Sequence, residues 1–304
     1  MIRVVFFGTP QISLKSLEYL YNSDEIDVVA VVTQPDKPAG RGHKLSMSCV
    51  KQFALAQDLP VFQPKSIKKD FDVQKALKDL NPDFFVTFAF GQILSQEVLD
   101  IPKYETINLH ASLLPKYRGA NPIQRAIING DTETGICTMI TELGLDCGDV
   151  CLRYVIPISD TMNCEELFGQ ISELSPELLK NTLIGLVNNT IIPCPQGEAG
   201  VCLASKLTKE ETLIDWFKSA QDIHNLVRGI YKFPSASFVY NDKLIKVLQT
   251  KVVNGSGNPG EFVDVTKEGV KVACGEDCLL VMKVKPEGKG EMNARDWFNG
   301  LKNR

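Results

Sequence analysis

Two residues of the segment 107–122 have the chemistry for acyl transfer. Asn108 and His110 stand two positions apart at the end of Glu105–Leu109, a run typical of a β-strand. Side chains at alternate positions of a strand point to the same face. An amide on that face can donate to a carbonyl oxygen as it becomes an oxyanion, and an adjacent imidazole can move protons near neutral pH. Taken alone, such a pair is more often a polar turn that satisfies its own backbone.

A carboxylate in the segment Glu142–Asp149 is the third candidate. Gly144 and Gly148 bracket Asp146, which suits a loop that comes close to a ligand or to another part of the backbone. A carboxylate near an imidazole would orient the ring and favour its charged form. Taken alone, Asp146 is more often the first residue of an Asx turn. The spacing does not show that Asp146 meets His110.

Other catalytic motifs are missing from the chain or stand in the wrong context. There is no GxSxG, HExxH or paired CxxC, which argues against serine and zinc hydrolases. With nine dispersed cysteines and three histidines, we expect no metal site and a reduced, cytoplasmic protein. The stretch Gly255–Gly260 reads GxGxxG, but a predicted strand follows it instead of a helix. We interpret it as a hairpin loop, so a nucleotide-dependent oxidoreductase loses its main support.

The elements that must hold the candidate residues alternate between strands and helices in the first half of the chain. This alternation predicts a Rossmann-like, mostly parallel sheet with helices on both faces. Ligands of such sheets bind beyond the carboxyl ends of the strands, here the loops 8–10, 33–45, 88–94 and 108–122. In the first of these loops, Thr9 is expected to cap a helix that has Pro10 at its first position. The expected strands are 2–7, 28–32, 61–62, 84–88 and 105–109, and the expected helices are 12–21, 71–80 and 164–187.

A second, smaller domain is expected after a linker rich in Pro and Gly. One helix, 220–230, precedes short alternating strands with tight turns, a pattern typical of a small β-barrel similar to the OB-fold. The expected strands are 237–240, 244–253, 261–265, 270–273 and 279–284. We therefore predict domains at 1–189 and 206–304, joined by a linker at 190–205.

Composition and charge narrow the class of protein. The 304 residues are 44% hydrophobic and 23% charged, as in an ordinary globular chain, and no apolar run is long enough to span a membrane. The net charge of −4 argues against non-specific coating of nucleic acid. That charge is uneven, because residues 190–304 hold 16 Lys and Arg against 14 Asp and Glu, whereas residues 1–189 hold 17 against 23.

Four segments, in order, resemble the methionyl-tRNA formyltransferase family. Val4–Pro10 is similar to the family's opening strand and turn, and Gln34–Gly42 to its inserted basic loop. Asn108–Pro115, continued by Tyr117–Ala120, resembles the formyltransferase core signature. Glu142–Asp149 is similar to the family's Asp loop. The likeness continues through Leu207–Glu210 and Ile223–Gly229, so it covers nearly the whole chain.

The resemblance implies a reaction and roles for these residues. A formyl group would pass from 10-formyltetrahydrofolate to the amine of methionine on initiator tRNA. Asn108 would bond the formyl oxygen, His110 would stabilise the tetrahedral intermediate and relay a proton, and Asp146 would orient His110 and assist proton removal. The folate site would comprise Phe90, Gly91, Gln92, Ile93 and Leu94, which cover the pterin, with Ser112, Leu113, Leu114 and Pro115.

RNA is the other partner that the resemblance implies. The basic loop has no acidic residue after Asp36, and its Lys37, Arg41 and Lys44 could reach the phosphates of an acceptor stem. Gly40 and Gly42 are expected to keep it mobile. The carboxyl-terminal barrel would bind tRNA if several of its lysines share one face, although the alternation of side chains along the strands could equally split them. For the basic loop, the plain alternative is a solvated surface loop. The chain is expected to be a monomer.

Two alternatives to this function stay open. The chain could formylate a small-molecule amine, such as glycinamide ribonucleotide or an amino sugar nucleotide, although the basic loop and the second domain argue against it. It could also be an RNA-binding protein with an inactive formyltransferase domain, against which the presence of Asn108, His110 and Asp146 argues.

Overall fold

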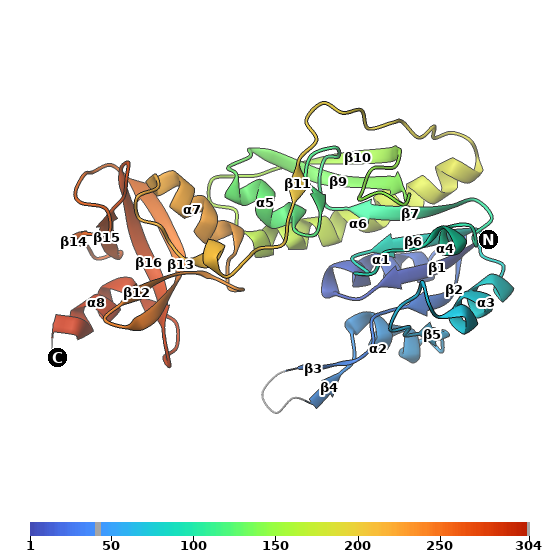
Figure 1. Cartoon of the computed structure of the whole chain (residues 1–304), viewed down its shortest axis with the longest axis horizontal. Coiled ribbons are helices and arrows are strands. Elements are labelled where there is room, and N and C mark those ends of the chain that lie inside the picture. Colours follow the sequence, from blue (N-terminus) through green and yellow to red (C-terminus); the bar gives the residue numbers. More distant parts are fainter. Residues whose placement is uncertain (40–43, 303–304) are drawn as a thin grey trace. The chain divides into compact units, whose positions relative to one another are not determined.

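The computed structural model of the chain describes residues 1–39 and 44–302. These residues form two compact units (Figure 1). The first comprises Met1–Gly119, Gly135–Ile156 and Phe168–Leu203, and the second comprises Ala120–Thr134, Pro157–Leu167 and everything from Ala204 onwards. Two segments from before residue 190 therefore belong to the second unit.

A seven-stranded sheet forms the centre of the first unit. Its strand order is β10-β9-β7-β6-β1-β2-β5. The five strands from β7 to β5 are parallel, and β9 runs antiparallel to β7. The strands are β1 (Ile2–Gly8), β2 (Ile26–Val32), β5 (Val61–Phe62), β6 (Phe84–Phe88), β7 (Glu105–His110), β9 (Glu133–Ile140) and β10 (Val150–Pro157). The predicted mostly parallel sheet is confirmed.

Strands β9 and β10 were not predicted, and the order of buried and exposed residues along each strand explains why. Six of the eight residues of β9 are buried, so apolar and polar residues do not alternate along it. Strand β10 is the edge strand of the sheet and exposes Arg153, Tyr154 and Val155 in succession. Neither pattern has the period of two that marks a half-buried strand.

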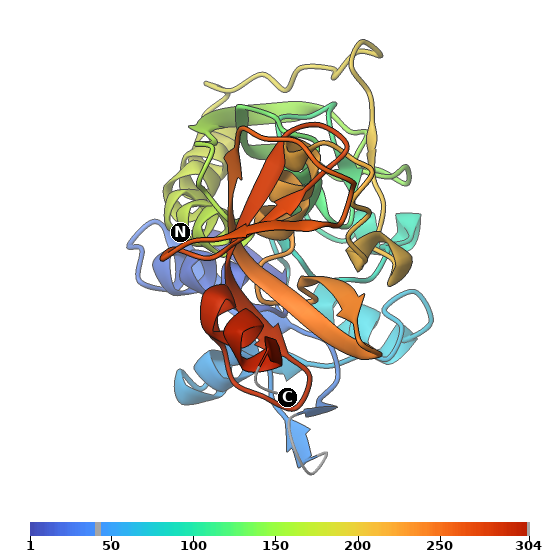
Figure 2. The ribbon, with the colours of Figure 1, turned by 90° about the vertical axis from the view of Figure 1, so that its left-hand side faces the viewer.

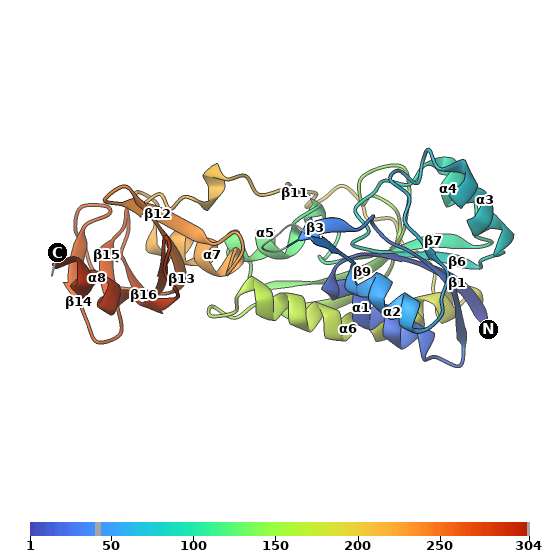
Figure 3. The same ribbon diagram turned by 90° about the horizontal axis from the view of Figure 1, so that it is seen from below.

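Helices cover both faces of this sheet (Figure 3). Helices α1 and α2 lie on one face together with the long α6, and α3 and α4 lie on the other. On the α3 and α4 face, side chains such as Phe7, Phe85 and Leu77 form a buried cluster. The helices are α1 (Gln11–Tyr21), α2 (Cys49–Ala56), α3 (Phe71–Asp79), α4 (Gln96–Leu99) and α6 (Cys164–Val187). Two of these, α2 and α4, were not predicted.

The turn after β1 differs from its predicted form. Pro10 is the N-cap of α1, without a side-chain hydrogen bond, and the helix begins at Gln11. Thr9 instead accepts a hydrogen bond at its hydroxyl from the backbone N–H of Gln34, at 3.2 Å. The prediction that Thr9 caps this helix is therefore wrong, because its side chain is used to hold the start of the basic loop.

Part of the basic loop is a β-hairpin. Strands β3 (Lys37–Ala39) and β4 (Lys44–Ser46) pair antiparallel, with Lys37 opposite Ser46. The hairpin is anchored at its base, where Asp36 accepts from Lys51 Nζ at 2.7 Å and from Gln63 Nε2 at 2.8 Å. These two bonds lower the pKa of the Asp36 carboxyl. The predicted mobile residues Gly40 and Gly42 lie outside the described residues.

The second unit is built on an antiparallel sheet of order β12-β13-β16-β15-β14, with β17 also paired to β16. The edge strands β12 and β14 meet through side chains, since the rings of Tyr240 and Phe262 pack edge to face at 5.3 Å. The sheet is thus a small, partly open barrel, as predicted. Its strands are β12 (Ala236–Tyr240), β13 (Lys243–Val253), β14 (Phe262–Val265), β15 (Val270–Ala273), β16 (Cys278–Pro286) and β17 (Met292–Asn293).

Two helices, α7 and α8, pack on this sheet. Helix α8, drawn in red in Figure 2, was not predicted and packs against β16 and β15. Its Trp297 lies in the buried cluster of this unit. The remaining elements are β8 (Arg118–Gly119), α5 (Pro122–Ile128), β11 (Leu203–Ala204), a 3-10 turn (Glu210–Thr212), α7 (Ala220–Gly229) and α8 (Ala294–Lys302).

The segment Gly255–Gly260 lies between strands β13 and β14 in the chain. Strand β14 follows it, so the segment does not open a helix over a phosphate group. However, β13 and β14 are not neighbours in the sheet. The connection is a crossing between separated strands, and its interpretation as a hairpin loop is wrong.

Helix α7 binds the segment 157–167 to the second unit. The guanidinium of Arg228, which is 6% exposed, donates to the carbonyl oxygens of Ser159 and Met162, both at 3.1 Å. His224 Nε2 donates to the carbonyl of Asp160 at 2.9 Å, while Nδ1 lies 2.8 Å from the hydroxyl of Thr250. Because a carbonyl oxygen only accepts, the neutral ring carries its proton on Nε2. Burial lowers the pKa of His224 below its ordinary value of 6.5.

The burial of His224 predicts how stability changes with pH. As the pH falls below about 6.5, the unfolded chain takes up a proton on His224 that the folded chain resists, so the free energy of unfolding falls. We expect the melting temperature of the wild type to drop more between pH 7 and pH 5.5 than that of His224→Gln, whose amide keeps a donor but does not titrate. Melting curves at both pH values measure this difference. Equal drops in the two proteins would contradict it.

Candidate active site

Asn108 and His110 lie at the carboxyl end of β7, with both side chains on the same face of the strand, as the alternation of side chains predicts. On the adjacent β6, Thr87 stands opposite Asn108 in the parallel register. Its hydroxyl donates to Oδ1 of Asn108 at 2.8 Å. The amide oxygen is therefore occupied, and the donor Nδ2 points away from Thr87. Thr87 thus sets which end of the amide faces a ligand.

His110 is held by a backbone carbonyl. Its side chain is 6% exposed, and Nε2 lies 2.8 Å from the carbonyl oxygen of Tyr117. Since that oxygen only accepts, Nε2 carries the proton. In the neutral ring, Nδ1 is then a free base. It lies 3.6 Å from Oδ2 of Asp146.

Asp146 meets both of these residues. Its Oδ1 is 3.5 Å from Nδ2 of Asn108, and its Oδ2 accepts a hydrogen bond from the backbone N–H of Gly119 at 2.8 Å. Asp146 has a φ of +46°, which is uncommon for a residue other than glycine. Backbone strain of this kind clusters at functional sites. The structure therefore brings together the three residues that the sequence singled out.

The arrangement has the parts that acyl transfer needs. The amide Nδ2 is a donor for a carbonyl oxygen that gains negative charge, and Nδ1 of the imidazole is a base beside a carboxylate. All three groups lie at the carboxyl edge of the parallel sheet, where ligands of such sheets bind.

Sequence reasoning missed the residues that hold the three groups. Thr87 could have been found by aligning the ends of the two predicted strands. Tyr117 and Gly119 contribute backbone atoms, and contacts of this kind carry no sequence signal. Gln196 donates from Nε2 to the carbonyl oxygens of Asp146 and Gly148, at 2.9 and 2.7 Å. It lies in the predicted linker, and no local pattern indicated it.

The predicted pterin-covering loop 90–94 has divided roles. Phe90 and Leu94 are buried in the core cluster of the sheet. Gln92 holds the neighbouring chain, accepting from the N–H of Ile67 and donating to the carbonyl of Pro64. Gly91 has a φ of +81°, and the side chain of Ile93 is exposed. Only Ile93 and the backbone of this loop are available to a ligand.

The predicted segment 112–115 is also partly structural. Ser112 is fully buried, and its hydroxyl donates to the carbonyl of Lys116 at 2.6 Å. Leu114 packs in a buried cluster with Cys137, Met139 and Val150. Leu113 and Pro115 are half-buried.

The predicted RNA-contacting residues of the basic loop are only partly described. Lys37 is exposed at the start of β3. Only the backbone of Lys44, at the start of β4, is described, and Arg41 lies outside the described residues. Lys51 is paired with Asp36.

Two thiols of this unit, Cys137 and Cys151, do not have the properties of an activated nucleophile. Burial raises the pKa of Cys137, and it raises that of Cys151 to about 12. Within residues 1–39 and 44–302, no group of three or more His, Cys, Asp and Glu side chains could hold a metal ion. The same stretches contain no helix long and apolar enough to cross a membrane.

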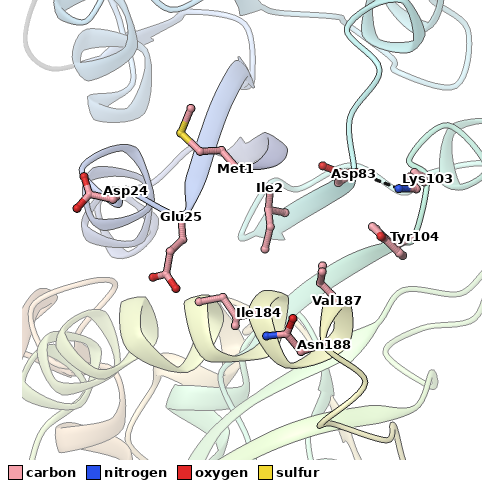
Figure 4. A pocket seen from close by; sticks show the side chains of 10 residues that line it. All are labelled: Met1, Ile2, Asp24, Glu25, Asp83, Lys103, Tyr104, Ile184, Val187 and Asn188. Atoms are coloured by element: carbon pink, nitrogen blue, oxygen red, sulfur yellow. Dashed lines mark ion pairs between the residues drawn. The ribbon is translucent and has the colours of Figure 1, made fainter.

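A pocket of about 540 Å³ lies elsewhere on the first unit (Figure 4). Its lining includes Met1 and Ile2, at the amino end of β1, and the ion pair between Asp83 and Lys103 at 4.0 Å. The amino ends of parallel strands lie at the edge of the sheet opposite to the catalytic candidates. This pocket therefore does not contain them.

Known proteins resemble the chain over both halves. Residues 2–183 match the family described as formyl transferase, and residues 206–302 match the formyl transferase C-terminal domain. The chain is 46% identical to methionyl-tRNA formyltransferase of Clostridium perfringens strain 13 over 301 residues, which cover 98% of this chain and 97% of the relative. It is 45% identical to that of Clostridium acetobutylicum over 302 residues, covering 99% and 97%.

Solved structures share the fold at lower identity. An N-formyltransferase from Helicobacter canadensis, in complex with folinic acid and dTDP-3-aminofucose, matches with a TM-score of 0.69 at 22% identity, covering 92% of this chain and 99% of that one. Methionyl-tRNA formyltransferase from Clostridium thermocellum matches with a TM-score of 0.58 at 15% identity, covering 84% and 96%. Because nearly the full length of these two clostridial relatives aligns at 45% and 46% identity, the chain belongs to the methionyl-tRNA formyltransferase family.

Proposed function

We propose that the chain transfers the formyl group of 10-formyltetrahydrofolate to the α-amine of methionine on initiator tRNA, giving N-formylmethionyl-tRNA and tetrahydrofolate. The observation that carries the proposal is the meeting of Asn108, His110 and Asp146 at one edge of the sheet in a member of this family. The reaction belongs in the cytoplasm, where aminoacylated tRNA is used, and we propose that the chain acts as a monomer.

The geometry supports one role for each of the three groups. The amine attacks the formyl carbon, and the formyl oxygen, which gains negative charge, accepts from Nδ2 of Asn108. His110 takes the proton of the attacking amine on Nδ1 and passes it to the folate nitrogen as the bond to the formyl carbon breaks. Asp146 lies beside Nδ1 and stabilises the imidazolium that forms.

Folate is proposed to bind along the loops 88–94 and 112–115. The backbone of Gly91 and Gln92 and the exposed side chain of Ile93 would contact the pterin, with Leu113 and Pro115 beside it. The buried Phe90, Leu94, Ser112 and Leu114 would shape this site from below.

The proposed tRNA contacts include Lys37, Arg41 and Lys44 of the basic loop and a face of the second unit. In the barrel, Lys246 of β13 stands directly opposite Lys285 of β16, and Lys283 stands opposite Gln249. Their neighbours Val247 and Val284 are in the core, so these lysines share the outer face. We call Lys246, Lys251, Lys271, Lys283 and Lys285 the lysine face.

The charge of the lysine face favours an anionic partner. Like charges directly opposite each other destabilise a sheet, and a bound phosphate would offset this. Among the described residues, no salt bridge joins these lysines to a carboxylate, and Lys251, Lys283 and Lys285 are exposed.

The direct test is transfer of labelled formyl from 10-formyltetrahydrofolate to methionyl initiator tRNA, with methionyl elongator tRNA, glycinamide ribonucleotide and an amino sugar nucleotide as competing acceptors. We expect label on the initiator tRNA alone. Label on a small-molecule amine would overturn the proposed acceptor, and no transfer to any acceptor would overturn the proposed reaction.

Removing the donor Asn108 or the base His110 should slow the chemical step. Asn108→Ala and His110→Ala are each expected to lower kcat by about 100- to 1000-fold, the effect of losing one such group in other acyl-transfer sites. The loss appears in kcat because the contact strengthens in the transition state. Rapid-quench kinetics with saturating substrates measures it, and Lys75→Ala is the control at an exposed position of α3. A kcat within threefold of the wild type would contradict the assigned role.

Removing two charges from the lysine face should weaken tRNA binding alone. Lys283→Ala/Lys285→Ala is expected to raise the KM for tRNA and to reduce the slope of log affinity against log salt by about one per lost phosphate contact. The KM for the folate should not change. Lys68→Ala/Lys69→Ala, with the same change in charge on exposed residues of the first unit, is the matched control. If the two double variants have the same KM for tRNA and the same salt dependence, the proposal that the lysine face binds tRNA is wrong.

A further inference from the structure

The linker between the two matched domains is docked on the catalytic unit. Cys194 exchanges both backbone hydrogen bonds with Val150, each at 2.9 Å. Further along, the carbonyl of Cys202 accepts from the N–H of Arg118 at 3.0 Å, and its Sγ accepts from the N–H of Tyr117 at 3.2 Å. The stretch from 194 to 202 therefore runs from the end of the Asp loop to the residues that contact His110.

Gln196, between these two anchors, makes four side-chain hydrogen bonds. Its Nε2 donates to the carbonyl oxygens of Asp146 and Gly148, at 2.9 and 2.7 Å. Its Oε1 accepts from Nε and Nη2 of Arg118, at 3.0 and 2.7 Å. The amide thus uses both of its N–H donors and both lone pairs of its oxygen.

The partners of Gln196 stand directly beside the catalytic contacts. Arg118 lies between Tyr117, whose carbonyl holds His110, and Gly119, whose N–H holds the carboxylate of Asp146. On the other side, Asp146 itself has the left-handed φ of +46° between two glycines. One side chain therefore joins the Asp loop to the loop that orients the imidazole.

We propose that Gln196 is a positioning residue for the transfer reaction, which fixes the carboxylate of Asp146 against His110 and Asn108 through the backbone of the Asp loop. The inference rests on the proposed function. Without the amide, the carbonyls of Asp146 and Gly148 lose their donor, and the carboxylate keeps its contacts with the N–H of Gly119 and with Nδ2 of Asn108 but loses the bonds that fix its loop. Because small displacements of catalytic groups cost rate, the change acts on turnover and leaves binding largely intact.

The test compares two substitutions at Gln196 with one in the same segment. Gln196→Ala removes all four bonds, and Gln196→Glu keeps the contact with Arg118 but replaces the donor with an acceptor. Glu198→Ala changes an exposed linker residue whose side chain makes no hydrogen bond to the described residues Glu142–Asp149. We expect kcat to fall about 10- to 100-fold in both Gln196 variants, with the KM for tRNA and for folate within about threefold of the wild type. Glu198→Ala should behave as the wild type.

A double-mutant cycle separates positioning from a general structural role. If Gln196 acts through Asp146, then Gln196→Ala should add little to the loss that Asp146→Asn causes alone. Losses that multiply in the double variant, or a kcat of both Gln196 variants within twofold of the wild type, would overturn the inference. If Gln196→Ala does not fold, as judged by its melting curve, Gln196→Glu carries the cycle. A wild type that fails to formylate tRNA would overturn the proposed function itself, which is a different result.

Discussion

The hydrogen bond from Nε2 of His110 to the carbonyl of Tyr117 is the contact on which the site depends. It decides which ring nitrogen is the base, because the nitrogen that faces the carbonyl must keep its proton. The other nitrogen then faces Asp146. For the carbonyl to reach the ring, the chain after β7 must fold back within seven residues, and this explains the tightly bonded turn that contains the buried Ser112 and the left-handed Tyr117. In this chain, the turn after β7 therefore places a backbone carbonyl against the imidazole of His110.

Side-chain chemistry and the alternation of strands and helices were predictable from the sequence, and backbone contacts were not. Asn108 and His110 could be placed on one face because strands alternate, and the carboxyl end of β7 could be identified as a site from the alternation of strands and helices. The meeting of Asp146 with His110 joins residues 36 positions apart, and only the resemblance to a family suggested it. Gly119 and Gln196 act through contacts that no local pattern encodes, whereas Thr87 could be found by aligning the ends of two predicted strands.

The predictions that failed have physical reasons in common. Thr9 and the segment Gly255–Gly260 were interpreted from local rules for caps and hairpins. In the fold, a tertiary contact with Gln34 takes the hydroxyl of Thr9, and the order of the barrel strands separates β13 from β14. The unpredicted β9 and β10 show the same limit, because burial on both faces or exposure at an edge removes the alternation that marks a strand.

The tautomer of His110 can be observed directly, and it tests the central claim that backbone contacts set the chemistry of the site. Long-range ¹H–¹⁵N correlation spectra of protein labelled with ¹⁵N-histidine report which ring nitrogen carries the proton. Spectra of His224→Gln and His43→Gln would assign the three rings. The account predicts that neutral His110 is protonated on Nε2 and bare on Nδ1. A neutral ring protonated on Nδ1 would contradict it, because the base would then face the carbonyl of Tyr117 instead of the reacting groups.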